Sequence, residues 1–245
     1  MPSNAFPIAG RIMRQIVRDR RTLALIIIVP LVVMTLISYS FPENKAMLSL
    51  YAPALLATLA LFFSFLLTGI SFLRERTQGT MERMMASPVS RLDMVLGYLL
   101  GFFIFALMQS LIVLLFTIYV LGVTYSGDLW QIFIFLIVIV TMAVNLGIFA
   151  SAFARNEFQM IQFIPLIIVP QVFVCGLLFP VSQMPDYLQW LAKFLPLTYA
   201  VDGIRAMMLE GKRLLDIGKE IGVLSAYAVA LMILAGSSLR RGKAA

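Results

Sequence analysis

Charged residues are absent from six long stretches of the chain. These stretches cover residues 22–42, 46–73, 94–127, 129–154, 158–185 and 221–239, and each has at least 19 residues. A helix needs about 20 mostly apolar residues to cross a bilayer. The strands of a membrane barrel alternate apolar and polar residues instead. The pattern therefore predicts an all-α integral membrane protein with six transmembrane helices, at roughly 23–41, 51–73, 94–122, 129–153, 160–179 and 219–238.

The composition excludes several classes of protein. Of the 245 residues, 61% are apolar and 13% are charged, whereas a soluble domain has about 25% charged residues. There is no histidine and a single cysteine, Cys175, so we expect no catalytic triad and no metal site. No Gly-x-x-x-x-Gly-Lys-Ser/Thr loop is present, so the chain is not expected to be an enzyme that binds ATP itself.

The distribution of charge predicts the orientation. With six spans, both termini lie on one side, together with residues 74–93 and 154–159. That side carries thirteen of the nineteen Lys and Arg residues and five of the twelve acidic residues. Because cytoplasmic loops are enriched in Lys and Arg, both termini are predicted to be cytoplasmic. The net charge of +7 is explained in this way, and no nucleic-acid partner is predicted.

Residues 1–22 have the pattern of an amphipathic helix. Arginines recur at spacings of three and four residues, and isoleucines form a separate stripe; they are Arg11, Arg14, Arg18, Arg21, Ile8, Ile12 and Ile16. Such a helix would lie along the cytoplasmic membrane surface, with its arginines toward lipid headgroups or a partner. The alternative is a simple charge signal that fixes orientation.

Residues 180–218 differ from the other connections. Aromatic and aliphatic residues alternate with charged ones, and Pro180, Pro185 and Pro196 divide the segment. A seventh span is disfavoured because it would bury four charged side chains, those of Lys193, Asp202, Arg205 and Glu210. We expect one or two short helices that form a re-entrant hairpin on the outer face.

Residues 74–93 are the most charged part of the chain. Met81, Met84 and Met85 are expected on one face of a short helix. Ser87-Pro88 ends this helix, because the residue before proline leaves helical geometry. A short helix between two spans could transmit motion from a soluble partner into the membrane. The alternative is a solvated loop helix without a partner.

Two segments resemble the permease subunits of type-2 ATP-binding-cassette exporters. The first segment is 74–101, with matching positions Glu75, Arg76, Gly79, Thr80, Glu82, Arg83, Ser87 and Pro88. The second is 173–205, with matching positions Gly176, Phe179, Pro180, Met184, Pro185, Trp190, Pro196, Tyr199 and Arg205. With the six predicted spans, the resemblance covers nearly the whole chain.

The resemblance implies a half-transporter in the cell (plasma) membrane. Two permeases, identical or paralogous, would combine with two separate ATPase subunits, which bind ATP and Mg. Residues 74–90 would be the coupling helix, and the turn 154–159 a second contact. The implied coupling residues are Glu75, Gly79, Thr80, Glu82, Arg83, Ser87, Pro88, Arg155 and Glu157.

Polar residues within the predicted spans are candidates for a substrate path. Gln109, Asn145, Gln171 and Phe65 could line it, although such amides more often make hydrogen bonds between helices. Gly97 and Gly101 form a Gly-x-x-x-Gly pair that allows close helix packing. Pro165 and Pro170 are expected to kink the fifth span.

No charged residue lies in the middle of a predicted span, although proton- and sodium-coupled carriers usually need such residues. Together with this absence, the resemblance implies ATP-driven export of a hydrophobic or amphipathic compound. The alternative is a carrier or channel that works alone.

Overall fold

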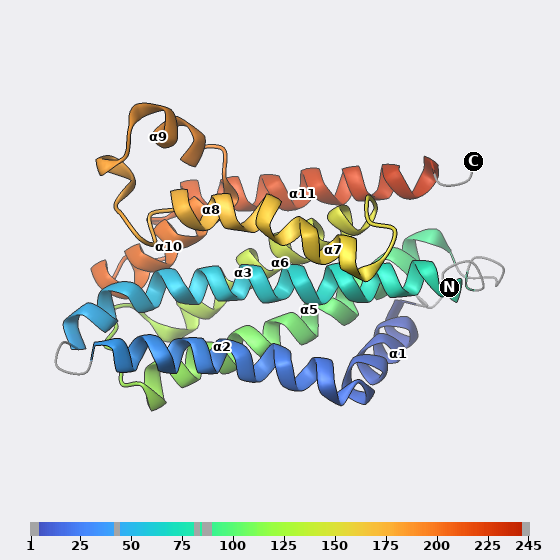
Figure 1. Cartoon of the computed structure of the whole chain (residues 1–245), viewed down its shortest axis with the longest axis horizontal. Coiled ribbons are helices and arrows are strands. Elements are labelled where there is room, and N and C mark those ends of the chain that lie inside the picture. The colour runs from blue at the N-terminus through green and yellow to red at the C-terminus, as the bar shows by residue number, and fades with distance from the viewer. Residues whose placement is uncertain (1–4, 42–44, 81–83, 85–89, 242–245) are drawn as a thin grey trace.

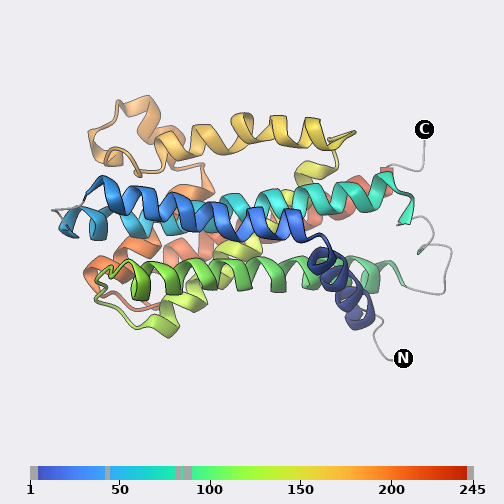
Figure 2. The ribbon, with the colours of Figure 1, turned by 60° about the horizontal axis from the view of Figure 1, so that its bottom comes forward.

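The computed structural model describes residues 5–41, 45–80, 84 and 90–241. Six helical segments are long and apolar enough to cross a membrane: Thr22–Ser40, Ala46–Thr77, Leu96–Val120, Leu129–Ser151, Glu157–Val174 and Gly218–Gly236. They run side by side, and both ends of the chain lie at the same end of the bundle (Figures 1 and 2). The predicted all-α membrane fold with six spans is confirmed. We call the end with the termini the inner end and the opposite end the outer end.

The spans are built from several labelled elements, some of which follow one another without a break. Counted one by one in the described part of the chain they are nine, in chain order α2 (Arg20–Ser40), α3 (Lys45–Thr77), α5 (Arg91–Leu115) with η1 (Phe116–Val120), α6 (Leu129–Ser151), α7 (Glu157–Phe163), η2 (Ile164–Ile168), α8 (Val169–Val174) and α11 (Gly218–Arg241). Helix α3 has 33 residues, which at about 1.5 Å per residue exceeds the roughly 30 Å hydrocarbon core. Its ends therefore extend beyond the apolar layer.

The centre of the bundle is the contact between α3 and α6. A methyl group on Gly147 would lie 2.7 Å from the carbonyl oxygen of Phe65 and 3.0 Å from the backbone nitrogen of Gly69. Only glycine permits this approach, which places the two backbones in direct contact. Phe65 itself is completely buried, so α3 is the helix around which the others pack.

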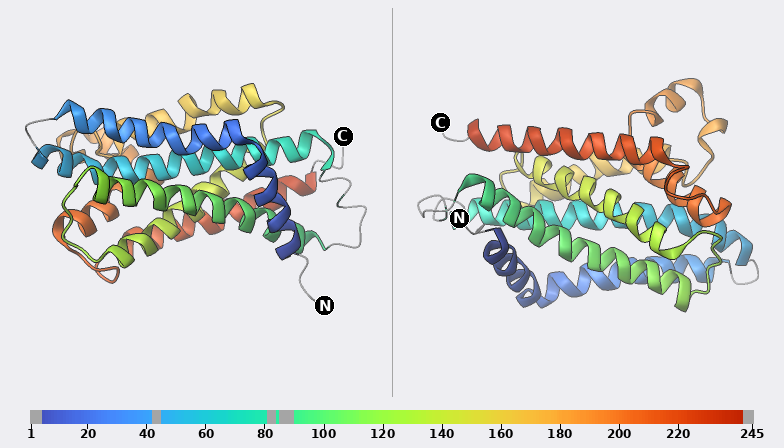
Figure 3. Two further views of the ribbon diagram at one scale, coloured as in Figure 1. Left: turned by 90° about the horizontal axis from the view of Figure 1, so that it is seen from below. Right: turned by 180° about the vertical axis from the view of Figure 1, so that it is seen from behind.

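Helix α1 (Ala5–Arg18) is separate from the first span and crosses the inner end of α5 (Figure 3, left). The predicted isoleucine stripe is present, since Ile8, Ile12 and Ile16 are all buried. A methyl group added to Gly97 would lie 2.6 Å from Cβ of Ile8. The apolar face of α1 therefore packs on the protein, and the partner of the Gly-x-x-x-Gly pair is α1.

The fifth span is interrupted where the sequence predicts a kink. Between α7 and α8 the five residues of η2 form a π-helix, in which the N–H of Val169 donates to the carbonyl of Ile164. Pro165 and Pro170 cannot donate backbone hydrogen bonds. The regular α-helical ladder is interrupted at this segment, and the kink itself stays a prediction.

The outer segment 180–218 contains η3 (Val181–Gln183), α9 (Asp186–Ala192) and α10 (Pro196–Glu210). Helix α9 projects from the outer end (Figure 1), whereas most side chains of α10 are buried against the bundle. Gly203 shows how tightly α10 packs, because an added methyl group would lie 2.3 Å from the Phe135 ring of α6. The sequence predicted one or two short helices here; the structure has two α-helices and one 3-10 turn.

Candidate functional site at the inner end

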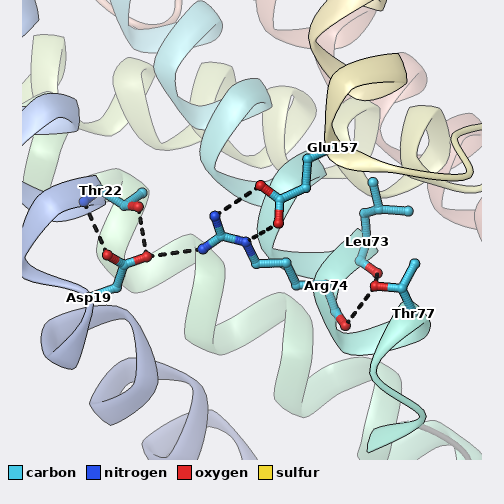
Figure 4. Close-up of polar contacts among 6 residues, drawn as sticks. All are labelled: Asp19, Thr22, Leu73, Arg74, Thr77 and Glu157. Atoms are coloured by element: carbon cyan, nitrogen blue, oxygen red, sulfur yellow. Dashed lines mark hydrogen bonds and ion pairs between the residues drawn. The ribbon is translucent and has the colours of Figure 1, made fainter.

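Arg74, in the last turn of α3, joins two other spans through its guanidinium group. Its Nε lies 2.6 Å and its Nη2 3.0 Å from the two carboxylate oxygens of Glu157, at the start of α7. Its Nη1 lies 3.0 Å from Oδ2 of Asp19. Figure 4 shows the guanidinium group between the two carboxylates. The planar guanidinium has donors for both partners at once, which a lysine ammonium would not present in this geometry.

Asp19 is placed by its own helix. It caps the N-terminus of α2, where its Oδ1 accepts a hydrogen bond from the backbone nitrogen of Thr22 at 3.2 Å and its Oδ2 one from the Thr22 hydroxyl at 2.7 Å. These bonds to Thr22, and then Arg74, lower the pKa of the Asp19 carboxyl below its usual value. The carboxylate is thus oriented by a local cap before it meets Arg74.

Glu75 faces the opposite way and is only 1% exposed. Its Oε2 lies 2.9 Å from Nη2 of Arg11, on α1, and accepts a 2.7 Å hydrogen bond from the Tyr98 hydroxyl, on α5. The sulfur of Met84 also contacts Arg11, 3.0 Å from Nη1. Burying a carboxylate is costly unless it is paired, so these contacts hold α1 and α5 to α3.

Arg76, the next residue of α3, contacts the end of α6. Its Nη1 donates to the backbone carbonyl of Ser151, at the C-terminus of α6. A positive charge at a helix C-terminus is favourable because of the unpaired carbonyl groups there. We name Arg74, Glu75 and Arg76 the Arg-Glu-Arg turn; these three consecutive residues hold the inner ends of α1, α2, α5, α6 and α7.

The two ion pairs of Arg74 are individually not strong. The side chain of Arg74 is about one-third exposed, and pairs at such positions contribute about 1 kcal/mol or less each. Their importance is geometric, because any displacement of the last turn of α3 strains contacts to five other helices.

Comparison with known proteins identifies the family. The model of a family described as "ABC-2 type transporter" matches residues 7–209. The chain belongs to this family.

Several curated relatives are similar to this ABC-2 type chain. Nodulation protein J of Rhizobium meliloti is 30% identical over 70% of the chain and 64% of its own length. The linearmycin resistance permease protein LnrN of Bacillus subtilis is 29% identical over 64% of the chain and 41% of its own length. ABC transporter G family member 20 of Dictyostelium discoideum is 28% identical over 74% of the chain but 25% of its own length. The chain thus spans between a quarter and two-thirds of these relatives.

In this ABC-2 type chain, the coupling residues predicted from the sequence fall into separate groups. Glu82, Arg83, Ser87 and Pro88 lie outside the described residues. Gly79 has a φ of +67°, a backbone conformation that glycine adopts readily, at the turn just after α3. Thr80 is half-buried and Arg155 is exposed at the turn before α7.

The remaining two predicted coupling residues, Glu75 and Glu157, bind within the chain. Helix α3 continues to Thr77, so the first four residues of the predicted coupling helix 74–90 belong to a membrane span. Glu75 therefore faces the protein interior. Met84 also packs inward against Arg11 and Tyr98, rather than standing on a free methionine face.

The four predicted pathway residues are not joined to one another by any hydrogen bond in the described part of the chain. Phe65 is in the core between α3 and α6, and Gln109 is 2% exposed. Asn145 donates within its own helix to the carbonyl of Thr141. Gln171 bonds both its own helix and α10, and is considered further below.

Sequence reasoning missed Arg11, Asp19, Arg74 and Tyr98 as parts of this site. The available signal was the Arg-Glu-Arg triplet directly after a charge-free run. Arg74 and Glu157, however, are 83 positions apart, and nothing in the local pattern indicates that they meet.

Proposed function

We propose that this chain is the permease subunit of an ATP-driven exporter in the plasma membrane. The observation that carries the proposal is the position of the Arg-Glu-Arg turn in a chain of the ABC-2 family. It lies one residue before the segment 78–90, and its contacts reach five other helices. A force applied to this segment would therefore reach the rest of the inner end through α3.

The proposed machine contains two permeases, identical or paralogous, and a separate ATPase that binds ATP and Mg. Residues 78–90 dock on the ATPase, with Glu82 and Arg83 as charged contacts and Thr80, Ser87 and Pro88 within the same segment. Arg155 adds a second contact, since it is exposed in the turn before α7. Glu75 and Glu157 act from inside by holding the docking segment to the bundle.

The proposed substrate is hydrophobic or amphipathic. The middle of each span is free of charged side chains, and an ion crossing there would meet no compensating group. One relative is named for linearmycin resistance and another as a probable multidrug permease, YbhS of Escherichia coli. Export of a drug-like or lipid-like compound agrees with both names.

The test is to co-express the chain with an ATP-binding-cassette ATPase from the same genome and to reconstitute the complex in liposomes. We expect ATP hydrolysis to be stimulated by amphipathic drugs or lipids. Glu82→Arg should reduce the co-purified ATPase at least about tenfold, since losing one partner of a desolvated charge pair costs about 2–5 kcal/mol.

Glu210→Arg is the matched control. It reverses a charge on an exposed residue at the outer end and should leave association unchanged. Transport by the purified chain without any ATPase would contradict the proposal and favour the carrier or channel alternative. Full association and transport by Glu82→Arg would remove residues 78–90 from the docking role.

A further inference from the structure

The fifth span is held at both of its ends by polar contacts to other elements. At the inner end, Glu157 binds Arg74 of the Arg-Glu-Arg turn. At the outer end, Oε1 of Gln171 accepts a hydrogen bond from the backbone nitrogen of Leu197 at 3.3 Å. Leu197 is in the first turn of α10. This span therefore connects the inner site directly to the outer hairpin.

Between these two contacts most of the span faces away from the rest of the chain, as the spans Thr22–Ser40 and Gly218–Gly236 do. Of the residues in its most apolar window, 22% are buried, compared with 72% in α3. Leu166, in the π-helical segment η2, is 70% exposed. What sets η2 apart is its π-helical hydrogen bonding between two α-helical segments, a feature that often marks functional sites, so η2 is the place where we expect this span to change shape.

Gln171 contacts both the π-helical segment and α10. Its Nε2 donates to the carbonyl of Ile167, within η2, at 2.8 Å, while its Oε1 accepts from the backbone nitrogen of Leu197. A π-helical turn contains one residue more than an α-helical turn. Converting it to α-helix would rotate α8 relative to α7 by about 100°, the rotation of one residue. The Gln171 amide could not keep both bonds after such a rotation.

Helix α10 depends on the Gln171 bond. Its N-cap residue, Leu195, provides no side-chain hydrogen bond, and the Leu197 side chain is completely buried. Without Gln171 the buried N–H of Leu197 would lose its acceptor, which is unfavourable. Further along α10, Arg205 donates to the carbonyl of Gly176 and Met208 accepts from the nitrogen of Ser126. Any movement of α10 thus moves the outer loops.

We propose that Gln171 is a positioning residue that couples the π-helical segment of the fifth span to α10. This inference rests on the proposed function. A displacement of the Arg-Glu-Arg turn, caused by the ATPase, is carried through Glu157 to η2 and passed by Gln171 to the outer hairpin. Gln171, predicted as a residue lining the substrate path, would then act on the outer end of that path through α10.

The experiment uses the complex with its ATPase. Cys175 is replaced by Ser, and Tyr187→Cys is introduced on α9, where the side chain is 71% exposed. The rate of labelling by an impermeant maleimide is compared without nucleotide and with ATP and vanadate. We expect a severalfold difference in the parent and its loss in Gln171→Met, which keeps the length of the side chain. ATP hydrolysis and the amount of complex should be retained.

Thr141→Val is the matched control, since the Thr141 hydroxyl donates to the Ile137 carbonyl of its own helix; it should keep the nucleotide dependence. Pro165→Ala tests the π-helical segment independently and should shift labelling in the absence of nucleotide, even if Gln171→Met does not assemble. Two results would contradict the coupling role. In the first, the parent hydrolyses ATP and transports, but its labelling rate is the same with and without nucleotide. In the second, Gln171→Met keeps the full nucleotide-dependent change in labelling rate. If the parent binds no ATPase, the proposed function itself fails.

Discussion

Gly97 shows how one residue fixes the position of the N-terminal helix. A methyl group there would lie 2.6 Å from Cβ of Ile8, 2.7 Å from its Cγ2 and 2.9 Å from the carbonyl oxygen of Ala5. The Cβ of Ile8 and the carbonyl oxygen of Ala5 do not move when a side chain changes its rotamer. The absence of a side chain at Gly97 is what allows α1 to lie directly on α5.

Gly97→Ala should therefore destabilise the protein by about 1–3 kcal/mol, the usual cost of overpacking. The melting temperature in detergent measures this. Gly222→Ala is the control, because an added methyl group there meets nothing within 4 Å. Alanine favours helix over glycine by about 1 kcal/mol, so this variant should be neutral or more stable. Equal melting temperatures for the two variants would contradict the close packing of α1 on α5.

At the scale of elements, the start of α2 is held by two kinds of contact to Asp19. The bonds to Thr22 lie within α2. One of them provides an acceptor for a backbone N–H at the N-terminus, which has no partner inside the helix. The bond to Arg74 belongs to the bundle and ties α2 to α3. Both favour the ionised carboxyl group, so the pKa of Asp19 is lowered from the ordinary value of 3.8.

Two substitutions separate these contacts. Asp19→Asn keeps a good cap but removes the charge that pairs with Arg74, whereas Asp19→Ala loses both and should cost about 1 kcal/mol more. Folding lowers the pKa of Asp19, so its charge stabilises the protein at pH values above the ordinary pKa. This contribution is lost as the pH falls through the pKa of Asp19 in the folded protein. The stability difference between the natural protein and Asp19→Asn should accordingly shrink in acid. A difference that stays constant from pH 7 to acid would contradict the role of the charge.

At the scale of the whole molecule, the two ends of the bundle differ in charge. The inner end has both termini and the Arg-Glu-Arg turn (Figures 1 and 3), and the sequence assigns most of the basic residues to it. Lys and Arg stay preferentially in the cytoplasm during insertion. The inner end is therefore predicted to be cytoplasmic and α9 to face outward.

Single-cysteine labelling of intact cells tests this orientation. In a Cys175→Ser background, a cysteine replacing Ser90, the exposed N-cap residue of α5, should not react with an impermeant reagent. A cysteine replacing Tyr187 on α9 should react. Reaction at position 90 in intact cells would invert the topology and contradict the proposed docking side.

The sequence by itself determined the features that depend on local composition. Each span can be recognised because transfer of about 20 consecutive residues into lipid is decided by those residues alone. The interruption of the fifth span follows from Pro165 and Pro170, which lack N–H groups wherever they occur. Gly79 likewise permits the turn after α3, because a residue without a Cβ atom can adopt its positive φ. The family resemblance depended on motifs of the same local kind, and the match over residues 7–209 confirmed it.

The tertiary structure alone decided which residues meet. Arg74 could have faced lipid headgroups or a partner, and it binds Asp19 and Glu157 because the inner ends of three spans converge. Arg11, predicted on a basic face, turns to the buried Glu75 because the isoleucine face of α1 packs on Gly97 and Gly101. Gln171 meets Leu197 because α10 packs into the bundle. These contacts join residues 26 to 83 positions apart, and only the packing of whole helices brings such residues together.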